Sequence, residues 1–183
     1  NLLWRLHSRM NQLRMTAYAS LLAALTAVGA YIAIPIGPVP IVLQNLFVYL
    51  SGLLLGSRWG LMGIAAYLLA GAVGLPVFAG GKGGIGHLVG PTGGYLLGFL
   101  PAVAIIGLVT EKTGGKILFG TAALIAATAV IYACGITWLS IVTGMTVVQS
   151  LLVGMVPFLP GDAVKITAAL FIARSLRPVM QKN

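Results

Sequence analysis

Long apolar runs separated by short polar or glycine- and proline-rich breaks set the pattern of this chain. The runs predict helices over 15–34, 41–55, 59–73, 93–109 and 117–141, and from Pro160 or Gly161 to about 176. A membrane-crossing helix needs about 20 mainly apolar residues. The pattern therefore predicts an all-α membrane protein with six transmembrane helices, and the unbroken apolar runs argue against a membrane β-barrel.

The breaks predict turns of different kinds. The segment 56–58 (GSR) reads as a tight turn, and 111–116 as a short charged turn. The segments 35–40 and 74–92 are rich in proline and glycine, which favours loops. Residues 142–159 are apolar but interrupted, so a short helix or a re-entrant piece is expected there.

The two ends of the chain are expected to lie outside the helical domain. Residues 1–14 mix leucines with basic side chains, which indicates an interfacial amphipathic segment or the frayed start of the first span. Residues 15–178 would form one six-helix transmembrane domain, and 179–183 a cytoplasmic tail.

Composition supports the membrane assignment. Hydrophobic residues make up 59% of the chain and charged residues 7%, against about 25% charged residues in typical soluble domains. The mean hydropathy is +1.04. Such a chain could not cover its surface with groups that favour water, so a multi-pass protein of a bacterial cell membrane is expected.

The net charge of +9 follows from topology. With six spans, nine basic residues fall on the side of both termini, and two (Lys82 and Lys165) fall on or toward the other. Basic residues concentrate on the cytoplasmic side of membrane proteins, where anionic lipids attract them. Both termini should thus be cytoplasmic, and no nucleic-acid partner is needed. The nine residues are Arg5, Arg9, Arg14, Arg58, Lys112, Lys116, Arg174, Arg177 and Lys182.

The three loops on the other side are nearly uncharged and apolar, so we expect these glycine-rich outer loops to cover a ligand pocket. Segment 80–84 (GGKGG) resembles part of a phosphate-binding loop, but Pro76 stands where the first glycine is needed and Gly83 where Ser or Thr is needed. A nucleotide site, a metal site, a cofactor site and catalytic residues are all unsupported, so the chain is not expected to be an enzyme.

Asp162 and Lys165 form the sharpest candidate site. They lie three residues apart, so they share a helix face, and ionisable groups at membrane depth are costly unless they are paired or functional. A structural ion pair and a polar clamp for a small ligand are both compatible with this spacing. We favour the clamp.

Other polar and aromatic groups have weaker claims. Gln44 could reach the same cavity or make an interhelical hydrogen bond, whereas Asn45 is expected to serve packing. Phe78 and Tyr95 flank the glycine-rich segment and are better candidates for a pocket wall than Trp138. His87 and Lys82 are expected to be solvated.

The first span carries Ala19, Ala23 and Ala27, spaced by four residues. Small residues at this spacing allow helices to approach closely. The stripe could serve packing within the chain or dock another membrane protein.

Four segments together resemble the BioY family, the substrate-binding S components of energy-coupling factor (ECF) biotin transporters. The resemblance covers about 15–178, and the first 14 residues lie outside it. The segments are 36–41 (IGPVPI) followed by Gln44, 74–81 (GLPVFAGG), 88–99 (LVGPTGGYLLGF) and 157–165 (PFLPGDAVK).

The resemblance implies a six-helix domain that captures biotin from outside, together with a transmembrane coupling protein and two ATP-binding-cassette ATPases that alone use ATP. It implies that Ala19, Ala23 and Ala27 dock the coupling protein. It also implies that Asp162 and Lys165 bind the polar head of biotin, and that Gln44 and segments 78–81 and 91–95 line the pocket. The pocket residues are then Asp162, Lys165, Gln44, Phe78, Gly80, Gly81, Pro91, Thr92 and Tyr95.

Biotin chemistry suits this set. The ureido ring has two N–H donors for a carboxylate and one carbonyl acceptor for an ammonium. The opposite orientation, with Lys165 taking the valeryl carboxylate, stays open. So do two rival functions, a stand-alone biotin carrier without an ATPase module and a purely structural membrane scaffold.

Overall fold

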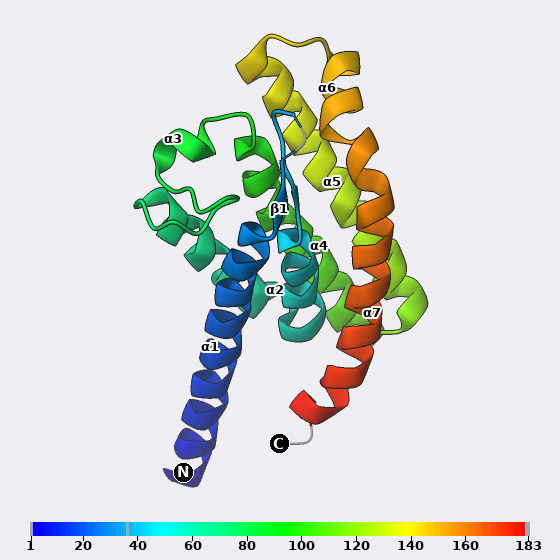
Figure 1. Cartoon of the computed structure of the whole chain (residues 1–183). Helices are drawn as coiled ribbons and strands as arrows, with labels where there is room; N and C mark the ends of the chain where they lie inside the picture. The colour runs from blue at the N-terminus through cyan, green and yellow to red at the C-terminus, as the bar shows by residue number, and fades with distance from the viewer. Residues whose placement is uncertain (1, 36, 182–183) are drawn as a thin grey trace.

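The computed structural model of the chain describes residues 2–35 and 37–181. Its helices are α1 (Leu2–Tyr31), α2 (Gln44–Ala72), α3 (Ile85–Leu88), α4 (Gly93–Thr113), α5 (Ile117–Thr143), α6 (Val147–Gly154) and α7 (Leu159–Gln181) (Figure 1). A 3-10 turn, Val156–Phe158, joins α6 to α7, and the two-residue strands β1 (Ala33–Ile34) and β2 (Ile41–Val42) pair in antiparallel fashion. The predicted all-α class is confirmed, with this small hairpin as an addition.

Helix α2 is two arms joined by a reversal at Gly56. The Gly56 backbone has φ 76° and ψ −170°, which breaks the helix. Gln44 donates to the hydroxyl of Tyr67 at 2.9 Å, whereas 23 residues of straight helix would separate them by about 34 Å. The predicted tight turn is therefore present, and the bundle contains six helical arms.

Glu111, at the end of α4, holds this reversal. Its carboxylate accepts from the backbone N–H of Ser57 at 2.6 Å and from the Ser57 hydroxyl at 3.0 Å. A carboxylate at the start of a helix satisfies free N–H groups and complements the helix dipole. One of the two acids in the chain thus caps the second arm of α2.

The described residues include five helical stretches long and apolar enough to cross a membrane, one of them the folded α2. Large apolar side chains such as Leu118, Ile125, Val164 and Phe171 are exposed on the bundle surface. An exposed apolar belt of this kind suits a lipid environment. The chain is a multi-pass membrane protein.

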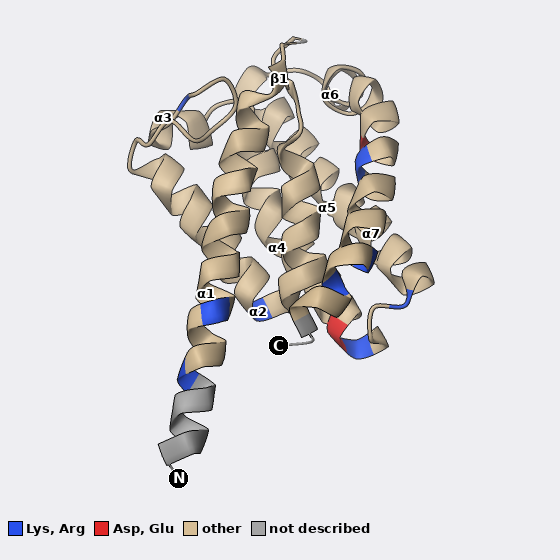
Figure 2. Ribbon diagram, turned by 60° about the horizontal axis from the view of Figure 1, so that its bottom comes forward, with Lys and Arg blue, Asp and Glu red and all other residues tan. Residues whose placement is uncertain are grey.

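Both described termini lie at one end of the bundle, with most of the described basic residues near them (Figure 2). Arg14 of α1 donates to the carbonyl of Met180 near the end of α7. Arg177 of α7 donates to the carbonyl of Gly114 at 3.3 Å, in the turn between α4 and α5. The α2 reversal is tied to the same end through Glu111. We call this the basic end.

Two helices differ in length from the spans predicted for them. Helix α1 runs unbroken from Leu2 to Tyr31 and stops short of the predicted end at 34, because Ala33 and Ile34 enter the hairpin. Helix α7 passes the predicted end at 176 and the start of the predicted tail, reaching Gln181 although it contains Pro178. The bond from Arg14 to Met180 holds this last turn. Residues 182 and 183 lie outside the described part.

The interrupted segment 142–159 contains a short helix, one of the two expected forms. Helix α6 begins with a capping box, in which the Thr146 hydroxyl accepts from the Gln149 N–H and the Gln149 side chain accepts from the Thr146 N–H. Such a box satisfies two otherwise free donors at a helix start. The box stabilises the start of α6, which lies at the end of the bundle opposite to the basic end (Figure 1).

Candidate functional site

A cavity lies where α2, α4 and α7 begin. Its walls are mainly apolar, and its polar groups come from separate helices, a common arrangement in small-molecule sites. The lining residues are Val39, Pro40, Val42, Gln44, Asn45, Ala79, His87, Thr92, Tyr95, Leu96, Phe99, Ile131, Tyr132, Gly154, Phe158, Asp162 and Lys165.

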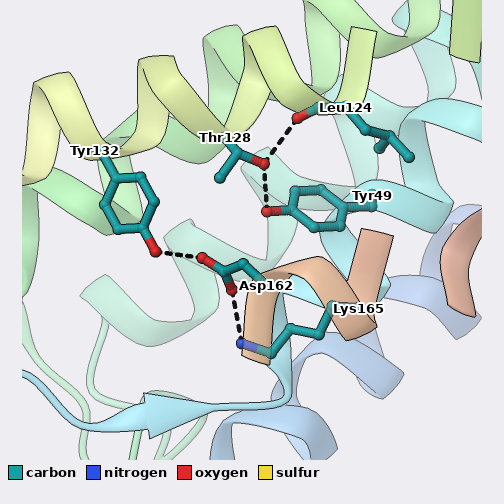
Figure 3. A network of polar contacts seen from close by, with 6 residues as sticks. All are labelled: Tyr49, Leu124, Thr128, Tyr132, Asp162 and Lys165. Atoms are coloured by element: carbon teal, nitrogen blue, oxygen red, sulfur yellow. Dashed lines mark hydrogen bonds and ion pairs between the residues drawn. The ribbon is translucent and has the colours of Figure 1, made fainter. Parts of the chain in front are cut away.

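A buried ion pair forms the charged wall of this cavity. The Lys165 Nζ lies 3.0 Å from the Asp162 Oδ1, and both residues are buried. The Tyr132 hydroxyl of α5 donates to the other carboxylate oxygen, Oδ2 (Figure 3). Because each carboxylate oxygen has a partner, the charge of Asp162 is held in a fixed position.

A second polar group lies behind this pair. The Thr128 hydroxyl donates to the carbonyl of Leu124 at 2.7 Å and accepts from the Tyr49 hydroxyl at 2.8 Å (Figure 3). All of these groups are satisfied within the bundle. The arrangement joins α2 to α5 beside the ion pair and stiffens that wall.

Gln44 connects the cavity to the glycine-rich loop, defined here as residues 74–92. The Gln44 amide donates to the Tyr67 hydroxyl at 2.9 Å, and this hydroxyl donates to the carbonyl of Val77 at 3.0 Å. Gln44 is 2% exposed and also lines the cavity. An interhelical bond and a place in the cavity wall, which the sequence left as alternatives, occur together.

Phe78 anchors the glycine-rich loop from inside. Its ring is fully buried, packs edge-on against Tyr67 with centroids 5.7 Å apart, and stacks on His87 at 5.3 Å. Gly71 of α2 makes room for it, because a Cβ there would lie 2.0 Å from the ring. The loop is therefore plugged into the bundle by one aromatic side chain.

His87 faces the cavity from α3. Its Nε2 lies 3.2 Å from the Thr92 hydroxyl, and the ring is half-buried. Burial, and next the charge of Lys82, hold the pKa of His87 below its usual value. The predicted solvated role fits the exposed Lys82 but is wrong for His87.

Two further bonds tie the outer segments together. The Tyr95 hydroxyl donates to the carbonyl of Gly154 in α6 at 2.9 Å. The Trp138 indole N–H donates to the carbonyl of Gly90 at 3.0 Å. Both aromatic residues thus brace the cavity rim.

The structure brings together five of the nine predicted pocket residues. Asp162, Lys165, Gln44, Thr92 and Tyr95 line the cavity. The other four, Phe78, Gly80, Gly81 and Pro91, belong to the covering segments and are not among the lining residues. Phe78 is a plug for the loop because the space beside Gly71 accepts its whole ring.

Tyr132, His87 and Asn45 line the cavity without having been predicted to do so. Tyr132 lies deep inside the long α5, away from the helix ends where membrane tyrosines usually concentrate. The sequence could have indicated Tyr132, because a hydroxyl in the middle of a membrane-spanning helix needs a buried hydrogen-bond partner.

The alanine stripe lies beside a separate shallow groove between α1 and the second arm of α2. Ala19 is buried against Gly63, whose added Cβ would meet the Ala19 carbonyl at 3.0 Å. Ala23 and Ala27 are half-buried. The groove is lined by Thr16, Ala19, Ser20, Trp59, Met62, Gly63 and Ala66.

Known proteins are similar to this chain in sequence and in fold. A family model described as the BioY family matches residues 6–182. The "Biotin transporter BioY" of Thermotoga maritima is 43% identical over 165 residues, which is 90% of this chain and 96% of the relative. The "Probable biotin transporter BioY" of Pyrococcus horikoshii is 43% identical over 158 residues, covering 86% and 93%.

A solved structure is similar as well. The S-component for biotin from an ECF-type ABC transporter superposes with a TM-score of 0.83 at 32% sequence identity, covering 92% of this chain and 93% of the other. The likeness therefore extends over most of the chain.

Proposed function

This chain belongs to the BioY family, a family of transporters rather than enzymes, and we propose that it captures biotin as the substrate-binding component of an ECF-type importer. The observation that carries the proposal is the buried Asp162–Lys165 pair on the wall of a largely apolar cavity. The names of the relatives and of the similar structure support biotin as the ligand.

The cavity offers complementary groups to each part of biotin. Asp162 accepts hydrogen bonds from the ureido N–H groups, and Lys165 donates to the ureido carbonyl. Tyr95, Leu96 and Phe99 provide apolar surface for the fused rings and the valeryl chain. A hydrogen bond to a charged group contributes about 1.5–3 kcal/mol.

The opposite orientation places the valeryl carboxylate on Lys165. Biotinamide separates the two, because it keeps the ureido ring and loses the carboxylate charge. Replacement of Lys165 by Gln weakens biotin and biotinamide equally if Lys165 meets the ureido carbonyl. It weakens biotin far more if Lys165 meets the carboxylate.

The glycine-rich loop is the proposed lid. Gly80 and Gly81 both have positive φ, near +70°, a conformation that glycine adopts without strain. The loop is held to the bundle by the Phe78 plug and by side-chain bonds from Tyr67, Tyr31 and Trp138 to carbonyls of the loop. Release of these contacts would open a path to the cavity, and Gly80, Gly81 and Pro91 would approach the ligand when the lid closes.

Energy is proposed to come from partners. A transmembrane coupling protein would dock on the α1 groove, near Ala19, Ala23 and Ala27, and two ATP-binding-cassette ATPases would hydrolyse ATP. The small residues of the groove permit a close helix approach. Ala19 lines the groove and packs against Gly63, whereas Ala23 and Ala27 lie one and two turns further along α1, partly packed against the core.

The basic end is proposed to face the cytoplasm, with the cavity toward the outside. Most of the described basic residues belong to elements that reach that end, namely Arg9, Arg14, Arg58, Lys112, Lys116, Arg174 and Arg177, whereas Lys82 and Lys165 do not lie there. The number of basic residues at that end follows the positive-inside rule.

Titration of the ligand-free protein with biotin tests the proposal. The protein is purified in detergent, dialysed and titrated by calorimetry, and we expect one saturable site at micromolar or lower biotin. The absence of binding in that range, from protein that remains folded, contradicts both the importer subunit and the stand-alone carrier.

A further inference from the structure

A second cavity lies at the basic end, on the opposite side of the bundle from the proposed biotin site. It is an open cleft bounded by α7, the turn between α4 and α5, and the first arm of α2. Arg174 and Arg177 of α7 line it, together with Thr110 of α4. Its lining contains no acidic residue.

Thr110 carries an unusual hydroxyl. The residue is 2% exposed, and its Oγ1 has no hydrogen-bond partner among the residues that the structure describes. Thr113, one turn later in the same helix, donates instead to the carbonyl of Val109 at 2.7 Å. A buried hydroxyl without a partner is costly. Because the Thr110 Oγ1 has under 1 Å² of exposed surface, a ligand atom in the cleft would satisfy it after a small movement of the side chain.

The turn between α4 and α5 leaves space for the Arg177 side chain. Gly115 has φ +75°, and a Cβ at this position would lie 1.1 Å from the Arg177 Nη1. The guanidinium therefore rests on the turn and donates to the Gly114 carbonyl at 3.3 Å. An arginine has five N–H donors, so most of its donors stay available to an anion.

The start of α5 adds to the positive character of the cleft. Ile117 and Gly120, in its first turn, line the cleft, and the N-cap residue Lys116 gives no side-chain capping bond. The first N–H groups of a long helix attract anions. Glu111 does not neutralise the cleft, because Ser57 holds its carboxylate.

The remaining walls are apolar. Leu53, Ile117, Leu170 and Ala173 line the cleft, and Ile117 and Leu118 are exposed on the neighbouring bundle surface. A ligand that combines an anionic phosphate with hydrocarbon chains fits both halves of this surface. We propose that the cleft binds the phosphate group of an anionic phospholipid through Arg174, Arg177 and the hydroxyl of Thr110.

The positive-inside rule alone explains basic residues at this end. The test must therefore separate a specific lipid site from general attraction of anionic lipid to the basic end. The matched variants are Arg174→Gln with Arg177→Gln, and Arg58→Gln as a control. Arg58 is exposed at the same end and does not line the cleft. Thr110→Val removes the hydroxyl and keeps the shape of the side chain.

The probe is dioctanoyl-phosphatidylglycerol, titrated into detergent-purified protein and followed by native mass spectrometry. Dioctanoyl-phosphatidylcholine serves as the neutral lipid. We expect one anionic lipid to be retained by the natural chain and by Arg58→Gln. The double arginine variant should bind it about tenfold more weakly or worse, and Thr110→Val should weaken it several-fold.

Inorganic phosphate, titrated against the same variants, separates the two sources of a phosphate group. Suppose that the natural chain binds inorganic phosphate but retains no lipid, and that the double arginine variant loses the phosphate. The cleft is then a site for a soluble anion, and the lipid assignment is overturned. Equal lipid retention by the double arginine variant and Arg58→Gln overturns the proposal, because the attraction is then general. Equal retention of both lipids by all variants overturns it too.

Discussion

The hydroxyl of Tyr132 donates a hydrogen bond to the Oδ2 of Asp162 and joins the middle of α5 to the start of α7. The other carboxylate oxygen faces Lys165 at 3.0 Å. Tyr132 is therefore a positioning residue, because it fixes the orientation of the Asp162 carboxylate that is proposed to bind the ligand.

Replacement of Tyr132 by Phe should weaken biotin binding about ten- to a hundredfold. The change removes a hydrogen bond within the protein that is worth about 1.5–3 kcal/mol and leaves the ring in place, so biotin must order the freed Asp162 carboxylate at a similar cost. Calorimetric titration measures the loss. The control is Tyr18→Phe on α1, outside the cavity lining, which should bind as the natural chain does. Equal affinity of both variants would remove Tyr132 from the site.

The Asp162–Lys165 pair can be divided into its structural and ligand-binding roles. Asp162→Asn leaves Lys165 as an unpaired buried charge and should lower the free energy of unfolding by about 3–5 kcal/mol. The double variant Asp162→Asn with Lys165→Met removes both charges, so stability should largely return while biotin binding stays lost. Thermal unfolding and biotin titration measure the two effects. Recovery of binding in the double variant would mean that the pair is structural.

Gly71→Ala should loosen the glycine-rich loop. The added methyl group would occupy the space of the Phe78 ring, since a Cβ at Gly71 lies 2.0 Å from it. Hydrogen exchange over 74–92 should become faster, and biotin should dissociate faster. Gly86→Ala is the control, because a Cβ there meets nothing within 4 Å. Unchanged exchange in Gly71→Ala would show that the plug does not hold the loop.

Acidification should open the same loop through His87. The pKa of His87 is lowered by burial and by Lys82, so the folded loop favours the neutral ring. That contribution to stability is present above the ordinary histidine pKa of about 6.5 and is lost as pH falls through the lower folded value. Biotin dissociation should thus accelerate as the pH falls below about 6.5.

Two variants check the role of His87. His87→Gln should remove this pH dependence, and Lys82→Gln should move its midpoint to higher pH because a neighbouring positive charge is gone. Stopped-flow dissociation measurements across the pH range give the midpoint. A pH dependence that survives in His87→Gln would assign the titration to another group.

Ala23→Trp should separate an importer subunit from a stand-alone carrier. Ala23 is half-buried, packs partly against the core and lies one helical turn from the groove residue Ala19, so a large ring there would obstruct a partner on the proposed docking face. Biotin binding should persist, whereas uptake and copurification of the coupling protein should fall. Leu21→Trp, on the exposed opposite flank of α1, is the matched control. Unchanged uptake in Ala23→Trp would favour the stand-alone carrier.

The sequence predicts the helices and the charged pair well because both depend on local spacing. Apolar runs of helical length give the spans, and the three-residue separation of Asp162 and Lys165 places them on one face. The tight turn at Gly56 is likewise anticipated by a glycine in a short polar break. These features need no knowledge of distant contacts.

The missed features depend on contacts between distant segments. Tyr132 reaches Asp162 across 30 residues, and Phe78 is buried because Gly71 leaves a hole of suitable shape. His87 enters the cavity wall through its stack on Phe78. No local pattern carries this information, because each contact depends on how two helices or a loop and a helix are placed.

The reversal at Gly56 decides whether the number of membrane crossings is even or odd. Without it, α2 would be a single crossing, and everything after residue 56 would be inverted relative to α1. Arg14 and the carbonyl of Met180, now in contact, would lie on opposite faces of the membrane. The turn at Gly56, which the bond from the Ser57 N–H to the Glu111 carboxylate stabilises, thus determines which residues of this chain lie on the same side of the membrane.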